Sequence, residues 1–554
     1  MTPKKAFTYT SQVQDQVLVK IIASPSAERR INNTLWLFEN PLFHINFGVQ
    51  ASAVLKKDVN GLHRPKGKKT VSIHKLEPLF NARSVTFVGA SNDPGKWGFL
   101  TLKHMLDGGF QGDIYPVNPR EAQILGLKVY RSITDLPETP DLAVIIVPPL
   151  AVPVVIKECV SKGIKAGIII TAGFAEVGGE GARLQNEIVE AARNGGLVLV
   201  GPNCNGVMSP WNKQHVQFPS FFVPPGPVAV IAQSGNVMDA LALQIQMHGF
   251  GCSACIASGN EAVLHCEDYL EYLAEDPRTK VILSYIEGFK NGERFLAVAR
   301  EVSKKKPIIM LKAGKTQAGA RAAASHTAAL AGADAVFDAV CQQSGVIRAK
   351  GLDEMLNIGL AFLRQPLPKG RGLGIVTGGG GWGVLAADAC AELGFDLVQL
   401  PDETINELDK ILPAWWNRGN PVDLVAGAEV DNIYKAVELV MQCPSIEAMM
   451  FLSLMPALRV GGFNAPQDDT AREQWGKQMI ESNAMALDEF NAMADKYKKP
   501  IVIASEHMWA TNYEQAGITF TLGQHNAVCY RMPGEAARVL DALVTYGEYV
   551  RKIQ

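Results

Sequence analysis

The residue best placed to carry a reacting group is a histidine within a run of small side chains. His326 lies between Ser325 and Thr327, and alanine and glycine dominate positions 318–332. Small side chains let a loop approach its partners closely and move, so a histidine there can reach different sites. An imidazole can also act as a nucleophile. A lone histidine is more often an ordinary surface or core residue, so the surrounding sequence must decide between the two interpretations.

Two tight turns could bind the phosphate of a phosphorylated histidine, because that group is an anion. Each follows an apolar, strand-like run and offers free backbone N–H groups, and the first also opens a helix whose dipole favours negative charge. The residues of these turns are Ser234, Gly235 and Asn236 in the first, and Gly259 and Asn260 in the second. The sequence therefore predicts an anion site at each turn.

Two further features could complete a phosphohistidine site. Glu287 ends another predicted strand, and a carboxylate on one imidazole nitrogen fixes the tautomer and leaves the other nitrogen as the nucleophile. A glycine-rich turn that includes Gly379 and Gly380 opens the helix predicted at 384–393. This turn is either another backbone cradle for an anion or flexible packing between domains.

The N-terminal half contains a turn that suits a nucleotide phosphate. The strand predicted at 85–88 runs into Gly89, whose turn exposes backbone N–H groups at a helix N-terminus. The dinucleotide fingerprint GxGxxG fails, because Ser91 and Pro94 occupy its second and third glycine positions. Arg120 lies where an NAD site usually places a carboxylate, and it suits a phosphate instead. A generic α/β turn is the alternative.

Neither the cysteines nor the lysine after Gly314 indicates a further cofactor site. The nine cysteines are scattered through apolar segments, which fits unpaired thiols in a reducing compartment. Cys252 and Cys255 form a CxxC, but residues three apart on a strand face opposite sides, so we predict buried thiols and no metal. A P-loop ending at Lys315 would need a glycine at Ile309.

The elements that must position these residues alternate between strand and helix. Short apolar runs end in Gly, Pro or Asn and are followed by amphipathic stretches, which predicts an α/β fold of parallel sheets flanked by helices. The pattern starts three times along 554 residues. We expect an irregular N-terminal extension at 1–71 and three units at 72–210, 211–364 and 370–554. Loops at the carboxyl ends of the strands should converge on one cleft in each unit.

The first seventy or so residues have few acidic side chains and end in a basic run. They are a disordered arm, an organellar targeting segment, or sequence upstream of a true start at Val71. The net charge of −2 excludes a global basic field for nucleic acid. No apolar run reaches the ~18 residues typical of a membrane span. We therefore expect a cytoplasmic protein without a nucleic-acid or membrane partner.

The strand-end motifs of the first unit resemble those of the CoA-binding domain of the NDP-forming acyl-CoA synthetases. They appear in the family order, and the resemblance extends from about position 72 to the C-terminus. It implies a Rossmann-like CoA-binding domain followed by two flavodoxin-like domains, with CoA as a substrate. The residues that it assigns to CoA are Gly89, Ser91, Asn92, Asn118, Arg120, Pro148, Thr171 and Ala172, with Asn203 shaping the path toward the thiol.

The same resemblance covers the second and third units. It implies that His326 is phosphorylated, that Glu287 orients it, and that the glycine-rich turn faces the same site. One departure follows the Gly259 turn, where the family has Ala-Asp-Val and this chain has Ala-Val-Leu at 262–264. A second departure replaces smaller residues with Trp415, Trp416 and Arg418, which either line a pocket for an unusual acid or lie at an interface.

The resemblance implies a function as the CoA-binding and phosphohistidine subunit of an ADP-forming carboxylic acid–CoA ligase. Acid, CoA and ATP would give acyl-CoA, ADP and phosphate through an acyl phosphate and phospho-His326. No remaining stretch is long enough for an ATP-grasp domain, so a separate β subunit would bind most of the ATP, ADP and Mg, in an α2β2 assembly. A non-catalytic CoA-binding regulatory or scaffold protein of the same fold is the alternative.

Overall fold

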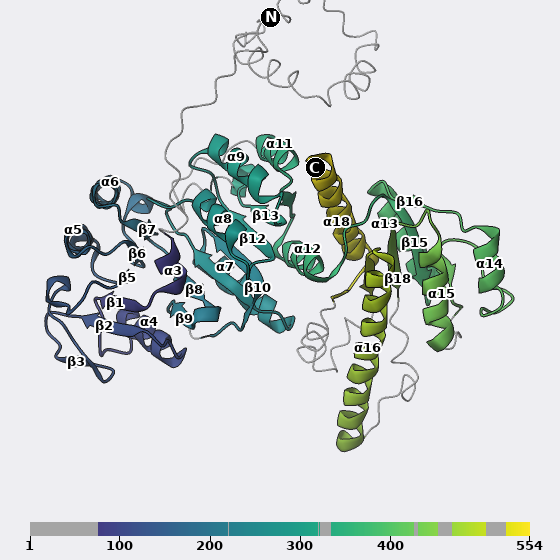
Figure 1. Cartoon of the computed structure of the whole chain (residues 1–554), viewed down its shortest axis with the longest axis horizontal. Helices are drawn as coiled ribbons and strands as arrows, with labels where there is room; N and C mark the ends of the chain where they lie inside the picture. The colour runs from purple at the N-terminus through teal and green to yellow at the C-terminus, as the bar shows by residue number, and fades with distance from the viewer. Residues whose placement is uncertain are drawn as a thin grey trace, which may run out of the picture. The chain divides into compact units, whose positions relative to one another are not determined.

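The computed structural model describes residues 76–219, 221–319, 321, 334–425, 430–452, 468–505 and 528–553; residue 430 and most of 469–485 are described by their backbone alone. Three mainly parallel sheets flanked by helices form this part of the chain (Figure 1). The α/β fold predicted from the sequence is therefore confirmed. His326 lies outside the described residues.

The first sheet is a five-stranded parallel sheet with the order β2-β1-β5-β6-β7. Its strands are β1 (Ser84–Val88), β2 (Asp113–Val117), β5 (Leu142–Ile145), β6 (Ala166–Ile169) and β7 (Val198–Val200). β1, β5 and β6 are buried along their whole length, as expected for parallel strands covered on both faces. The chain moves outward from β1 in one direction and from β5 in the other. The carboxyl ends of β1 and β5 are therefore a topological switch point, where open α/β sheets bind ligands.

Helices and short elements surround this sheet and join its strands. They are α3 (Glu77–Asn81), α4 (Trp97–Asp107), α5 (Val152–Lys162), α6 (Gly179–Gly195), the hairpin of β3 (Gln123–Ile124) and β4 (Leu127–Lys128), and the 3-10 turns η3 (Pro149–Ala151) and η4 (Ala175–Val177). α5 and α6 end at glycines with a left-handed backbone, Gly163 and Gly196, which close each helix before the next strand.

The second sheet has seven strands in the order β14-β13-β12-β10-β11-β8-β9. These are β8 (Gly206–Ser209), β9 (Gln214–Val216), β10 (Pro225–Ala232), β11 (Cys252–Ala257), β12 (Val281–Ile286), β13 (Ile308–Lys312) and β14 (Ile347–Arg348). β8 pairs antiparallel with β11, so the chain enters this sheet at Gly206, a few residues before the expected boundary at 210. Cys252 and Cys255 are buried on β11. The helices are α7 (Gly235–Met247), α8 (Cys266–Glu275), α9 (Gly292–Val302), α11 (Asp334–Ser344) and α12 (Leu352–Arg364).

The third sheet is parallel, with the order β16-β15-β18-β19-β20 and β17 paired to β15. Its strands are β15 (Gly372–Thr377), β16 (Asp396–Leu397), β17 (Val422–Asp423), β18 (Ala448–Leu452), β19 (Ile501–Ala504) and β20 (Cys529–Tyr530). Its helices are α13 (Gly380–Glu392), α14 (Asp402–Leu408), α15 (Val430–Gln442), α16 (Asp469–Tyr497) and α18 (Pro533–Ile553). None of the helices in the described ranges is both long and apolar enough to cross a membrane.

Candidate functional site

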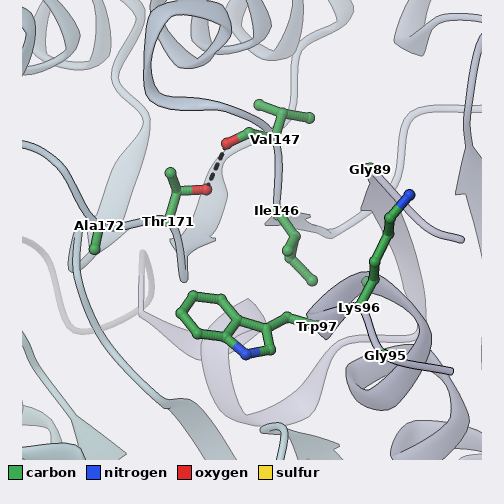
Figure 2. Close-up of a pocket in the computed structure, with 9 residues that line it drawn as sticks. Gly89, Gly95, Lys96, Trp97, Ile146, Val147, Thr171 and Ala172 are labelled. Carbon is green, nitrogen blue, oxygen red and sulfur yellow. Dashed lines mark hydrogen bonds between the residues drawn. The ribbon is translucent and has the colours of Figure 1, made fainter. Parts of the chain in front are cut away.

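A pocket of about 430 Å³ opens at the switch point of the first sheet (Figure 2). It is lined by Gly89, Gly95, Lys96, Trp97, Gly98, Ile146, Val147, Thr171 and Ala172. Three of these, Gly89, Thr171 and Ala172, were assigned to CoA from the sequence. The other six assigned residues, Ser91, Asn92, Asn118, Arg120, Pro148 and Asn203, are not among its lining residues.

The floor of the pocket depends on backbone segments that approach too closely for side chains. Gly89 has φ +94°, and a Cβ added there would lie 2.1 Å from the carbonyl oxygen of Ile146. A Cβ on Gly98, in the first turn of α4, would lie 2.1 Å from the carbonyl oxygen of Gly89. The start of α4 is therefore pressed against the end of β1, which brings the first N–H groups of the helix to the pocket.

Lys96 and Trp97 line the pocket but were missed as site residues in the sequence. Lys96 is the N-cap of α4 and Trp97 is its first residue. The Trp97 side chain is 47% exposed, and its ring stacks on Phe218 with 5.2 Å between the ring centroids. Figure 2 shows this ring extending from the start of α4 toward the loop that carries Thr171 and Ala172. A cation and an aromatic residue directly after a phosphate-type turn were the signal in the sequence that could have revealed them.

Several of the assigned residues outside the lining shape the turns around the pocket. The Asn118 side chain donates to the carbonyl oxygen of Ala90 at 2.8 Å and accepts from the backbone N–H of Arg120 at 2.8 Å. Asn92 donates to Glu121 and to the carbonyl oxygen of Gln123. The Ser91 hydroxyl oxygen accepts from the N–H of Asp93, and the Arg120 side chain is exposed to solvent. These contacts hold the ends of β1 and β2 together.

The wall formed by Thr171 continues toward the second sheet. The Thr171 hydroxyl donates to the carbonyl oxygen of Val147 at 2.8 Å, as Figure 2 shows. The backbone N–H of Asn203 donates to the carbonyl oxygen of Thr171 at 2.9 Å. The Asn203 side chain then donates to Oδ1 of Asn260 at 3.3 Å. Asn203 thus connects the loop that lines the pocket with the Gly259 turn of the second unit.

At the second sheet, the Gln233 side chain joins the ends of β10 and β12. Its Oε1 accepts from the backbone N–H groups of Glu287 at 2.6 Å and of Gly288 at 3.3 Å, and its Nε2 donates to the carbonyl oxygen of Gly288 at 3.0 Å. Glu287 is only 4% exposed. Gln233 directly precedes Ser234, so this buried bridge places Glu287 beside the first of the two predicted anion turns. No motif in the sequence indicated this role for Gln233.

The Ser234 turn opens α7, so a helix begins where the sequence predicted one. Ser234 is the N-cap, but its side chain makes no capping hydrogen bond, and Asn236 is exposed. A Cβ on Gly235 would lie 2.2 Å from the Asn205 side chain, which donates to Asp239 at 2.9 Å. Burial raises the pKa of Asp239 to about 6. A carboxyl with a raised pKa therefore lies one turn into this helix.

The second anion turn directs its amide side chain toward the first unit. Gly259 has φ +58°, and Asn260 is 6% exposed. The Asn260 Nδ2 group donates to Glu176 Oε2 at 2.5 Å and to Gln185 Oε1 at 3.0 Å. The hydrogen bonds of this side chain are thus made with the first unit, and the backbone N–H of Asn260 also donates within the protein, to the carbonyl oxygen of Pro202. The prediction of Asn260 as a phosphate ligand does not fit these bonds, and of the two predicted residues Gly259 is the one whose N–H is in none of them.

Gly379 and Gly380 make their described contacts within the third unit. Gly379 is the N-cap of α13, and its backbone bonds with the Thr377 hydroxyl at 2.8 and 3.2 Å. A Cβ on Gly380 would lie 3.0 Å from Oδ2 of Asp423, so the turn and the end of β17 are close together.

The two tryptophans of the third unit have opposite environments. Trp416 is 3% exposed and donates to Asp409 at 2.8 Å, so it belongs to the core, whereas Trp415 is 76% exposed. Arg418 forms an ion pair with Asp409 at 2.6 Å. Of the two interpretations left open by the sequence, an acid pocket lined by both tryptophans does not fit these positions.

Family models match the chain in three consecutive segments. A CoA binding domain matches residues 83–210, a succinyl-CoA ligase like flavodoxin domain matches 225–362, and a ligase-CoA domain matches 373–455.

Curated relatives and a solved structure are similar over most of the chain. The α subunit of acetate–CoA ligase [ADP-forming] II from Pyrococcus furiosus is 42% identical over 69% of this chain and 83% of its own. The α subunit of ligase I from that organism is 37% identical over 86% and 99%. The structure of the dinucleotide-forming acetyl-coenzyme A synthetase 1 of Ca. Korarchaeum cryptofilum, in complex with phosphate and ADP, is 32% identical over 86% and 98%, with a TM-score of 0.74. The match spans about half the length of some other relatives.

Proposed function

The chain belongs to the NDP-forming acyl-CoA synthetases, among the α subunits of ADP-forming acetate–CoA ligases, and we propose how its pocket and turns perform that reaction. It is the CoA-binding subunit of an ADP-forming acid–CoA ligase. The observation that carries the proposal is the pocket at the ends of β1 and β5, which lies in the segment that matches a CoA binding domain.

We propose that the pocket holds CoA through its glycine turn and the start of α4. The first N–H groups of α4, together with the Lys96 ammonium group, suit the phosphates of CoA, and Gly89 lets the backbone approach closely there. The Trp97 ring offers an apolar surface to the uncharged part of the molecule. Thr171 and Ala172 form the wall on the side of the second unit, toward which the thiol end would extend.

We propose that His326 carries the phosphoryl group, with Glu287 fixing its tautomer. The carboxylate oxygen of the acid attacks the phosphorus of phospho-His326, the P–N bond breaks, and an acyl phosphate forms. The CoA sulfur then attacks the acyl carbonyl carbon, the C–O bond to phosphate breaks, and acyl-CoA and phosphate leave. The backbone N–H groups at the start of α7 after Ser234, and the N–H of Gly259, would neutralise the charge on the phosphoryl oxygens. Phosphate contacts from Asn236, Gly379 and Gly380 are part of the same proposal.

A separate β subunit completes the proposed enzyme. Two relatives are themselves named as α subunits, which supports a second kind of subunit for this chain as well. We propose that this subunit carries an ATP-grasp domain that binds ATP or ADP with Mg, in an α2β2 assembly. His326 would move between the CoA site and that nucleotide site.

Labelling of His326 tests the proposal. The full chain is incubated with its ATP-grasp partner and γ-labelled ATP, and the label on the chain should be acid-labile and base-stable. His326→Ala should abolish the label, whereas His248→Ala, which changes a histidine at the end of α7, should retain it. Label that persists in His326→Ala would contradict the assignment. A wild-type chain that binds CoA but never becomes labelled would favour the non-catalytic alternative.

A further inference from the structure

One carboxylate joins the loop that lines the CoA pocket to the Gly259 turn. Glu176 lies in η4, four residues after the pocket residue Ala172. Its Oε1 accepts from the backbone N–H groups of Gly173 at 2.6 Å and of Phe174 at 3.1 Å. Its Oε2 accepts from Nδ2 of Asn260 at 2.5 Å. The same side chain therefore fixes the shape of the first loop and holds the second turn.

Both polar atoms of the Asn260 side chain take part in hydrogen bonds that connect the two units. Both its oxygen and its nitrogen are used, because Oδ1 accepts from Asn203 at 3.3 Å and Nδ2 also donates to Gln185 at 3.0 Å. Asn260 is 6% exposed, and a buried amide that loses its acceptor is destabilising because water cannot replace the partner. The turn therefore has a strong preference for the position in which Glu176 holds it.

Backbone contacts make the two segments a continuous unit around this side-chain bridge. The N–H of Asn260 donates to the carbonyl oxygen of Pro202 at 2.9 Å, and the N–H of Ala262 donates to that of Gly201 at 3.0 Å. A Cβ on Gly259 would lie 2.4 Å from the carbonyl oxygens of both Pro202 and Asn203. The backbone of the Gly259 turn thus packs directly against the segment that follows β7. Glu176 adds a side-chain hydrogen bond from the loop that lines the pocket.

The bridge from Glu176 is a charge-assisted one. Burial acts to raise the pKa of Glu176, but the hydrogen bonds from Asn260, Gly173 and Phe174 outweigh burial and hold this pKa below its usual value. The carboxyl is therefore ionised at neutral pH, and hydrogen bonds to an ionised acceptor are stronger than bonds between neutral groups.

We propose that Glu176 is a positioning residue that sets the separation between the CoA-facing loop and the phosphate-facing turn. The inference rests on the proposed function, in which the CoA sulfur must reach an acyl phosphate held at the second unit. Reacting atoms must approach to about 3–3.5 Å, and a misplacement of about 1 Å can cost roughly a hundredfold in rate. Because CoA and phosphate are held by different sheets, a rigid connection between the two loops is what keeps that distance.

Glu176→Gln tests this role with little change in size. The Gln oxygen can still accept from Gly173 and Phe174, but the Gln amide group would then present a donor to the Nδ2 donor of Asn260. The full chain is labelled at His326 in two separate experiments. Labelled inorganic phosphate with acetyl-CoA labels His326 through the reaction at the CoA site. γ-Labelled ATP with the partner subunit labels His326 through the reaction at the nucleotide site. We expect the first rate to fall about tenfold, while the second rate and the affinity for CoA change less than twofold.

Glu180→Gln is the matched control, because Glu180 lies four residues further on and forms an exposed pair with Arg183. It should leave both labelling rates unchanged. An unchanged rate from phosphate and acetyl-CoA in Glu176→Gln would overturn the inference alone. An equal fall in the two labelling rates of Glu176→Gln would also overturn it, because it would indicate that the variant is destabilised as a whole. If the wild-type chain is labelled by neither route, the proposed function fails first and this inference fails with it.

Discussion

Glu261, the residue after Asn260, is a carboxyl buried in the protein interior. Its side chain is 3% exposed and accepts a hydrogen bond from the Ser258 hydroxyl at 2.8 Å. Burial raises the pKa of Glu261 to about 7, and the bond from Ser258 only partly opposes this rise. The folded protein therefore holds a proton on Glu261 at pH values where the unfolded chain has released it.

Glu261→Gln should change stability in a pH-dependent way. Between the usual pKa of 4.5 and the folded pKa of about 7, the unfolded wild-type chain ionises while the folded chain stays protonated, so wild-type stability falls as pH rises through this window. Glutamine does not titrate. The unfolding free energy of Glu261→Gln relative to wild type should therefore increase by about 3 kcal/mol between pH 4.5 and pH 7.5.

Urea unfolding at several pH values measures this difference. Glu293→Gln is the control, because Glu293 is exposed at the start of α9 and its substitution should give no comparable trend. A difference between Glu261→Gln and wild type that stays constant with pH would show that Glu261 is ionised in the folded protein.

At the scale of the element, the Gly259 turn needs glycine for two independent reasons. Its φ of +58° lies in the left-handed region, where a Cβ is unfavourable. That Cβ would also meet two backbone oxygens, of Pro202 and Asn203, at 2.4 Å. Backbone cannot move aside as a flexible side chain can, so the turn and the segment after β7 would have to separate.

Gly259→Ala should therefore destabilise the protein by about 3 kcal/mol, from the left-handed backbone and the overlap together. It should also slow labelling of His326 from phosphate and acetyl-CoA, because the phosphate-facing turn is displaced. Gly292→Ala is the control, since a Cβ at this first residue of α9 has no heavy atom within 4 Å. Thermal unfolding measures the stability of the two variants. Equal stability would be inconsistent with the close approach of the Gly259 turn to the carbonyl oxygens of Pro202 and Asn203.

At the scale of the whole molecule, the C-terminal helix α18 connects the second and third units. It follows β20 of the third sheet, yet the Tyr546 hydroxyl donates to the carbonyl oxygen of Ser303, beyond α9, at 2.8 Å. The Tyr546 ring packs edge-on against Phe362 of α12, with 5.2 Å between centroids. Arg538 bonds to Glu354 of α12 at 2.8 Å. One helix therefore buries side chains against both units.

Tyr546→Ala should weaken this connection and reduce the cooperativity of unfolding. Removing a large buried side chain costs about 3 kcal/mol or more, and here that loss falls on the contact between two units. Scanning calorimetry should show the single transition of these units broadening or dividing into two. Lys552→Ala, an exposed change near the end of the same helix, should leave the transition unchanged. An undivided, unshifted transition in Tyr546→Ala would mean that other contacts hold the units together.

Local sequence determined the fold class and the positions of the turns. Apolar runs followed by Gly, Pro or Asn predicted the strands, and the glycine turns after them predicted where ligands would bind. Gly89 directly follows β1, Thr171 and Ala172 lie just beyond the end of β6, and the family resemblance assigned all three to CoA. The CoA chemistry came from the resemblance of these motifs to a family.

Only the tertiary structure decided which turns meet and which side chains serve the pocket. Lys96 and Trp97 line it because the sheet order places β1 beside β5, and sheet order depends on packing between segments far apart in the chain. Asn260 was predicted from its turn as a phosphate ligand, yet its amide is bonded to Glu176, 84 positions earlier. No local pattern encodes that bond, because it forms only when two sheets bring their carboxyl edges together.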